Sequence, residues 1–203
     1  MTRLRFLPVV LALFCTLVAA AAPKEEFDPM TASIEENIAF PAVEGKQSGA
    51  VAAAIGHLVA TLRHAGYEVD AVRKGEVAMV TIRCAELFAP NATELLLQAS
   101  KKLAPLLPYI MRSDNYKVVV AVHSDNTGDE MYADRLTSDR ANAIDEYYFH
   151  ASGDKETGII PYGLGSDEPV APNSGRANRE KNRRVEIYFV PTAELIEKIK
   201  RNK

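Results

Sequence analysis

The residues best suited to chemistry begin where an apolar run, residues 118–122 (VVVAV), gives way to polar residues 123–129 (HSDNTGD). An apolar run rich in β-branched residues is typical of a buried strand. Ligand sites in α/β sheets favour the C-terminal ends of strands, so Asp125 is a candidate to bind an ammonium group or a cation. Aspartate is also common in turns, and a purely local role for Asp125 is the alternative.

An arginine further along the chain strengthens the case for a site. Apolar residues surround Arg140 at helical spacing, namely Leu136, Ala143, Ile144 and Tyr147. This spacing puts Arg140 on or beside the face of a helix that packs on the core. A buried guanidinium needs a partner, because leaving it unpaired is costly. Asp125 could serve directly, in a structural salt bridge, or through a ligand that carries both charges.

Four motifs follow one another over the second half of the chain. They read VHSDNTG from residue 122, RLTSDRANAIDEYY from 135, YGLGSDEPVAPN from 162 and KNRRVEIYFV from 181. In this order they resemble the GHTD-x-x-G, L-S-x-x-R-A, G-x-G-x-x-x-P-x-x-N and N-R-R-V-E patterns of the OmpA-like peptidoglycan-binding domain, and the resemblance covers residues 77–190. It implies a Gram-negative envelope protein that is not an enzyme, needs no cofactor, and binds peptidoglycan non-covalently through the diaminopimelate of the stem peptide.

The resemblance also implies which residues bind the ligand. The family's acid and arginine match Asp125 and Arg140, which would take the ammonium and the carboxylate of one amino-acid end of diaminopimelate. An ammonium suits a carboxylate and a carboxylate suits the forked guanidinium, so the chemistry agrees with this assignment. Family members also contact the ligand from the loop before the first helix, from the residue two after the acid and from the NRR motif, which match Asn91, Thr127 and Arg183.

Each of these further residues also has a local interpretation. Asn91, followed three residues later by Glu94, has the pattern of a helix capping box. Thr127 suits a turn. Arg183 belongs to a basic cluster that includes Arg176, Arg179, Lys181 and Arg184. Leu87 and Phe88 are expected to pack beneath the site rather than to touch the ligand.

The chain departs from the family pattern at three side chains. Val122, Thr137 and Ala133 stand where the family has glycine, serine and a ligand-contacting asparagine. The segment between Gly175 and Asn182 is also longer than usual. Loss of the amide at position 133 matters most, since it removes a contact and predicts a changed affinity.

Three other functions compete with this interpretation. His123 and Asp125 lie on one side of a strand and could hold zinc in a metal-dependent hydrolase, but the other histidines lack ligand spacing with a second acid, so no metal site is expected. The basic cluster could contact nucleic acid, but the chain has more acidic than basic residues, 27 against 24. A structural or partner-binding envelope module would use Asp125 and Arg140 only as a salt bridge.

Hydrophobic periodicity predicts the elements that position these residues. Helices are expected at about 48–66, 91–107, 129–150 and 192–203, strands at 67–72, 77–82, 118–122, 159–164 and 185–189, and a loop at 165–182, with Ser48 and Asn91 as N-caps. The predicted fold is an α/β two-layer sandwich: helices packed on a mixed four-stranded sheet of order βαβαββ, preceded by a helix and hairpin.

The N-terminus has the layout of a secretory signal peptide, residues 1–22. Two arginines precede an apolar stretch at 6–18, and small alanines follow at 19–22. Cleavage would leave a periplasmic chain without a membrane span, associated with the cell wall or outer membrane. The net charge would change from −3 to −5, which opposes binding to nucleic acid. Cys84 would be the one cysteine left, so no intramolecular disulfide is expected.

The remaining chain divides into four parts. Residues 23–47, which mix prolines and charges without a period, are expected to form an extended spacer. Residues 48–76 hold the N-terminal helix and hairpin strand, 77–191 the peptidoglycan-binding domain, and 192–203 a basic helix. Outer-membrane or other envelope proteins are further candidate partners.

Overall fold

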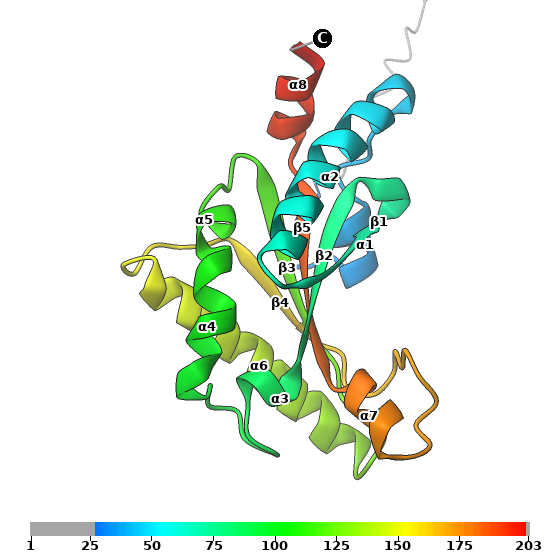
Figure 1. The fold of residues 1–203 in the computed structure, drawn as a ribbon, viewed down its shortest axis with the longest axis vertical. Coiled ribbons are helices and arrows are strands. Elements are labelled where there is room, and N and C mark those ends of the chain that lie inside the picture. Colours follow the sequence, from blue (N-terminus) through cyan, green and yellow to red (C-terminus); the bar gives the residue numbers. More distant parts are fainter. Residues whose placement is uncertain (1–26, 202–203) are drawn as a thin grey trace, which may run out of the picture.

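The computed structural model describes residues 27–201, so the predicted signal peptide at 1–22 lies outside the described residues (Figure 1). Its centre is one mixed sheet of order β1-β2-β5-β3-β4. The strands are β1 (Glu68–Val72), β2 (Val77–Arg83), β3 (Tyr116–Val122), β4 (Ile159–Gly163) and β5 (Arg184–Pro191). β3 and β4 pair in parallel, and the other neighbours are antiparallel.

The two faces of the sheet carry different hydrophobic clusters, because successive side chains along each strand point to opposite faces. Val118, Val120 and Val122 of β3 pack with Ile187 of β5 in the larger core. Val119 and Ala121, one position along, belong to a smaller cluster on the opposite face. The central strand β5 is buried along its whole length, which fixes its position between β2 and β3.

Most of the helices cover the larger core. α2 (Ser48–His64), α6 (Glu130–Ala151) and α8 (Ala193–Arg201) all contribute buried residues to it. Shorter turns complete this layer: α3 (Cys84–Leu87), η3 (Leu97–Ala99), α4 (Ser100–Leu103), η4 (Ala104–Leu106) and α5 (Leu107–Ile110). The remaining elements are α1 (Ile34–Ala39), η1 (Gly45–Gln47), η2 (Arg73–Gly75) and α7 (Arg176–Asn182). The mixed sheet with helices and the predicted helices of α2, α6 and α8 are therefore confirmed.

The N-terminal part differs from the prediction in two ways. The hairpin strand β1 joins the sheet as a fifth strand, because its register with β2 is continuous from Glu68 to Val72. The segment predicted as an extended spacer contains α1, whose N-cap Ser33 forms a capping box with Glu36. Ile34 of this helix packs on the smaller cluster, so apolar burial orders a segment that has no visible period.

Three local predictions were also wrong. Ser48 is the first residue of α2 rather than its cap, and its hydroxyl donates to Glu76 at 2.5 Å. The helix expected from Asn91 begins only at Leu97 and runs as alternating 3₁₀ and α turns, which Pro105 and Pro108 interrupt. The last seven residues of the loop predicted at 165–182 form α7.

Helix α6 lies very close to β4, and this contact sets the position of Arg140. A Cβ atom at Gly163 would be 2.2 Å from the backbone nitrogen of Ser138, so only glycine fits there. The Thr137 hydroxyl accepts a hydrogen bond from the nitrogen of Gly165 at 3.0 Å. These contacts bring α6 to the C-terminal ends of β3 and β4, where the polar residues follow β3.

Candidate functional site

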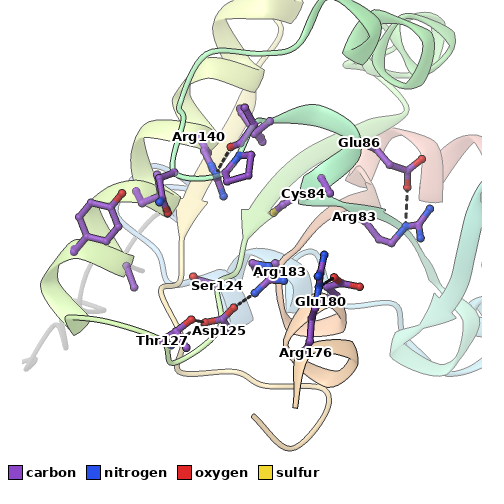
Figure 2. Close-up of a pocket in the computed structure, with 18 residues that line it drawn as sticks. Arg83, Cys84, Glu86, Ser124, Asp125, Thr127, Arg140, Arg176, Glu180 and Arg183 are labelled. Atoms are coloured by element: carbon purple, nitrogen blue, oxygen red, sulfur yellow. Dashed lines mark hydrogen bonds and ion pairs between the residues drawn. The ribbon is translucent and has the colours of Figure 1, made fainter. Parts of the chain in front are cut away.

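A cleft of about 560 Å³ opens at the C-terminal end of β3 (Figure 2). Its walls come from α3 and the loop after it, from the N-terminal half of α6, and from α7. All five predicted site residues line it: Asn91, Asp125, Thr127, Arg140 and Arg183. The structure thus brings together residues that are up to 92 positions apart in the sequence.

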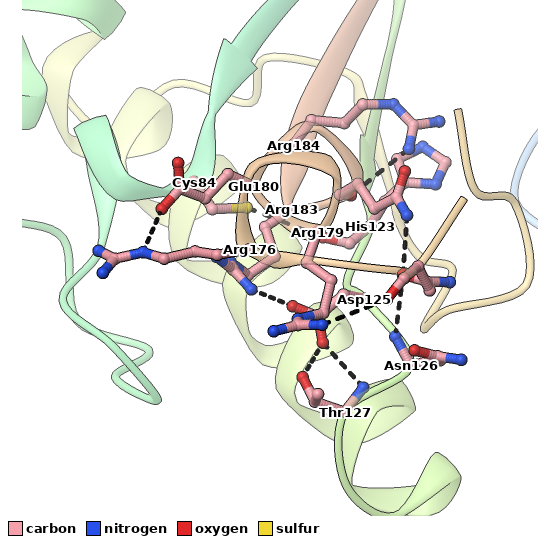
Figure 3. Close-up of polar contacts among 12 residues, drawn as sticks. Cys84, His123, Asp125, Asn126, Thr127, Arg176, Arg179, Glu180, Arg183 and Arg184 are labelled. Atoms are coloured by element: carbon pink, nitrogen blue, oxygen red, sulfur yellow. Dashed lines mark hydrogen bonds and ion pairs between the residues drawn. The ribbon is translucent and has the colours of Figure 1, made fainter. Parts of the chain in front are cut away.

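Asp125 is buried, with 2% of its surface exposed. Its carboxylate accepts hydrogen bonds from the backbone nitrogen of Thr127, at 2.8 Å, and from the Thr127 hydroxyl. It also forms an ion pair with Arg183, and Figure 3 shows these partners around it. Thr127 therefore has the predicted turn role and lines the cleft as well.

Arg140 is also buried, at 4% exposed, but its partners are not carboxylates. Its Nε donates to the carbonyl of Ala92 at 2.8 Å and its Nη2 to the carbonyl of Ala89 at 3.2 Å. The guanidinium lies over the Phe88 ring, 4.9 Å from its centroid. Within residues 27–201 it forms no ion pair, so the direct Asp125 to Arg140 salt bridge considered from the sequence is not present. Burial lowers the pKa of Arg140, but a guanidinium stays protonated at neutral pH.

Arg183 reaches the cleft because α7 ends there and β5 begins with the next residue. Its side chain is 35% exposed, and the Asp125 carboxylate accepts its hydrogen bond. Arg184, one residue along, points to the other face of the sheet, where its Nε donates to Glu186 at 2.7 Å. Strand alternation therefore separates two adjacent arginines of the NRR motif.

Asn91 does not cap a helix. It has φ of 58°, a left-handed conformation that asparagine tolerates, and it is exposed at the rim of the cleft. Phe88 lines the cleft and Leu87 lies behind it in the core, as expected. Ala133 lines the cleft at the position where the family has asparagine.

Sequence reasoning missed one part of the cleft. Arg83 and Glu86 form an ion pair with Nε and Oε1 3.2 Å apart, and Arg176 and Glu180 form another at 2.9 Å. All four line the cleft. The signal for the second pair was present, since arginine and glutamate four residues apart lie together on a helix, but the segment was predicted to be a loop.

His123 points away from the cleft. Its Nε2 lies 3.2 Å from Glu186, which also accepts from the Tyr188 hydroxyl at 2.5 Å. Burial alone would raise the pKa of the Glu186 carboxyl, but hydrogen bonds from His123, Tyr188 and Arg184 bring it down to about 2. Among the residues that the structure describes, no group of three or more His, Cys, Asp or Glu could hold a metal ion.

None of the helices between residues 27 and 201 combines the length and apolarity that spanning a membrane requires.

Comparisons with known proteins agree with this geometry. Residues 87–183 match the OmpA family. The outer-membrane lipoprotein YfiB of Pseudomonas aeruginosa is 36% identical over 101 residues, which cover 50% of this chain and 60% of YfiB. The peptidoglycan-binding protein ArfA of Mycobacterium bovis is 39% identical over 71 residues, covering 35% of this chain and 22% of ArfA.

A solved structure shows the same fold. The cell wall anchor of the type VI secretion system from Pseudomonas aeruginosa superposes with a TM-score of 0.56 and 26% identity, over 68% of this chain and 96% of that one. The chain spans less than two thirds of the length of YfiB or ArfA. None of these three names describes an enzyme, which agrees with the expectation of a binding protein.

Proposed function

Because residues 87–183 of this chain form an OmpA family domain, we propose that the chain binds peptidoglycan non-covalently through the diaminopimelate of the stem peptide. The free amino-acid end of diaminopimelate carries one ammonium and one carboxylate. The cleft offers a buried carboxylate, Asp125, and two arginines, Arg140 and Arg183. Such a zwitterion would satisfy charges of both signs at once.

The observation that carries the proposal is the state of Arg140. It is a buried guanidinium that donates to two backbone carbonyls and lies over the Phe88 ring, and within the described chain no acid forms an ion pair with it. Burying a charge without a counter-charge is expensive, so the position is explained best by an anion that arrives with a ligand. A structural module would instead be expected to pair Arg140 with an acid of its own.

The remaining residues suggest how the ligand is held. Asp125 would accept the ammonium while keeping its hydrogen bonds from Thr127. Arg183, which already contacts Asp125, could share its guanidinium with the ligand carboxylate opposite Arg140. Asn91 at the rim would offer a side-chain amide, and this could offset the loss of the amide at Ala133.

The names of the relatives support a role at the cell wall. YfiB is an outer-membrane lipoprotein, ArfA is peptidoglycan-binding, and the type VI protein is a cell wall anchor. We infer that this chain is exported to the periplasm and anchors or positions an envelope component on the wall. The cleft lies at the end of the molecule that holds α3 and α7, away from α8 (Figure 1). Binding there would leave the α8 end free for such a component.

The test is a pull-down of the chain on purified cell-wall sacculi, with Asp125→Asn as the variant. We expect binding to fall by about 10-fold to 150-fold, since a hydrogen bond to a charged group contributes about 1.5–3 kcal/mol. Asp167→Asn, an exposed acid outside the cleft, is the matched control and should bind normally.

A ligand control separates this site from general adhesion. Free diaminopimelate should displace the chain from sacculi, whereas Nα-acetyl-lysine amide, whose side chain ends in an ammonium without a carboxylate, should not. If both compounds displace it equally, or if Asp125→Asn binds like wild type, the proposal is wrong.

A further inference from the structure

The cleft continues beyond the five predicted residues. Arg83 and Glu86, with Arg176 and Glu180, lie on the side of Arg183 away from Thr127 (Figure 2). They come from the end of β2, from α3 and from α7, so three separate elements build this side. The volume of about 560 Å³ falls in the range that holds drug-sized ligands, which leaves room beyond one amino-acid end.

The charges that line the cleft do not balance. Among residues 27–201, four arginines line it, Arg83, Arg140, Arg176 and Arg183, against three acids, Glu86, Asp125 and Glu180. A zwitterionic ligand adds no net charge and leaves this excess of one positive charge in place. One additional carboxylate on the same ligand would remove it.

The two outer arginines are available to such a carboxylate. Arg83 and Arg176 have side chains that are 71% and 88% exposed, and ion pairs as exposed as theirs contribute little stability. Glu86 would stay paired if Arg83 turned to a ligand, because Lys102 lies 3.1 Å from its other oxygen. Glu180 is half exposed, so water would solvate it if Arg176 moved.

We propose that Arg83 and Arg176 form a second subsite of the cleft, which binds a further carboxylate of the stem peptide. This inference rests on the proposed function. The stem peptide offers two such groups close to the zwitterionic end of diaminopimelate: the backbone carboxylate of diaminopimelate itself, when it ends the peptide, and the α-carboxylate of the preceding glutamate. Arginine suits either, because its forked donors match a carboxylate.

The experiment measures the dissociation constants of soluble ligands by calorimetry. The ligands are free diaminopimelate, the alanyl-glutamyl-diaminopimelate tripeptide, and two tripeptides amidated at one or the other extra carboxylate. The variants are Arg83→Ala, Arg176→Ala and the double variant, with Lys181→Ala as a control because Lys181 is exposed on α7 outside the cleft.

Each single variant should bind the tripeptide about 2-fold to 5-fold more weakly, as expected for partly exposed charge pairs. Its affinity for free diaminopimelate should change less than its affinity for the tripeptide if the glutamate supplies the carboxylate, and by a similar factor if diaminopimelate supplies it. Amidation of the recognised carboxylate should weaken binding of the tripeptide to wild type by a similar factor. It should not weaken binding to the double variant, since the amidation and the arginine substitutions remove the same interaction. Whichever amidation has this effect identifies the source of the carboxylate.

Two results would overturn the subsite while leaving the proposed function intact. One is a double variant that binds the tripeptide like wild type while Asp125→Asn does not. The other is an equal loss in Lys181→Ala that fades with added salt, which would indicate diffuse charge attraction. If wild type binds neither free diaminopimelate nor the tripeptide, the proposed function fails and the subsite with it. Both outer arginines are exposed, so thermal melting should confirm that the variants stay folded.

Discussion

The guanidinium of Arg140 lines the cleft and also holds one of its walls in place. Its bonds to the carbonyls of Ala89 and Ala92 hold a loop whose ends meet where Phe88 and Leu95 form an isolated antiparallel bridge. Asn91 lies at the tip of this loop. Arg140 therefore helps to determine where one wall of the cleft stands.

Replacement of Arg140 by lysine tests both roles. Lysine keeps the charge but cannot reach two carbonyls and a ligand carboxylate together, because it lacks the planar fork. We expect Arg140→Lys to weaken sacculus binding by about 10-fold to 150-fold. The melting temperature should fall by about 2–4 °C, for a loss of about 1 kcal/mol.

Arg135→Lys is the control for this change, since Arg135 lies on the same helix with its side chain 84% exposed and outside the cleft. It should leave binding and melting unchanged. Arg140→Lys with unimpaired binding would show that the guanidinium only supports the loop.

The buried cluster on the other face of the sheet makes a prediction about pH. Glu186 receives hydrogen bonds from His123, Tyr188 and Arg184, and its pKa in the folded chain is about 2, below its ordinary value of 4.5. The unfolded chain therefore takes up a proton first as the pH falls. The contribution of Glu186 to stability, on the order of 3 kcal/mol, is complete above about pH 4.5 and is lost as the pH falls towards 2.

Urea unfolding at pH 6, 4 and 3 should therefore show a smaller loss of stability in Glu186→Gln than in wild type, because the variant has no carboxylate to protonate. Sacculus binding by the folded variant should be unchanged, since neither His123 nor Glu186 lines the cleft. Parallel loss of stability in both proteins would mean that other acids control the acid response.

At the level of elements, the sequence predicted those with a clear hydrophobic period. Helix α2 places Val51, Ile55 and Leu58 on one face, and all three are buried. The apolar run 118–122 became β3, and the alternation at 185–189 became β5. In these segments the local hydrophobic pattern and the tertiary packing favour the same structure, so the pattern alone is enough to predict the element.

Elements without a period were not predictable. Helix α7 has seven residues and buries only Asn182, so no apolar stripe marks it. Asn182 is held instead by the chain at Ala171, whose nitrogen donates to its Oδ1 at 2.9 Å and whose carbonyl accepts from its Nδ2 at 2.9 Å. Such contacts depend on the folded loop, which the sequence alone does not place.

The same limit applies to the site. Sequence and resemblance gave the five residues that the cleft brings together, but not their partners. Asp125 pairs with Arg183 rather than Arg140, because α7 directs Arg183 into the cleft while Arg140 is held by the loop after Phe88. The predicted capping box at Asn91 and Glu94 failed because the chain turns left-handed at Asn91.

Over the whole molecule, the cleft and the C-terminal helix occupy different ends. α3 and α7 lie near one end of the long axis and α8 near the other (Figure 1). The basic residues of α8 are partly neutralised there, since Lys198 contacts Asp114 at 2.7 Å and Glu194 at 3.1 Å. A chain that binds the wall at one end and another envelope component at the other requires export, so location is a test of the whole proposal.

Cell fractionation should find the chain in the periplasm, with a mature N-terminus directly after Ala20, Ala21 or Ala22. The reason is the arrangement of arginines, an apolar stretch and small alanines at residues 1–22, which suits recognition and cleavage by the secretion machinery. N-terminal sequencing of the periplasmic protein gives the cleavage site. Leu11→Arg, which puts a charge in the apolar stretch, should keep the chain in the cytoplasm, whereas Leu195→Arg near the other terminus should not block export. Recovery of the uncleaved chain in the inner membrane would contradict the prediction and indicate a domain tethered to that membrane through residues 6–22.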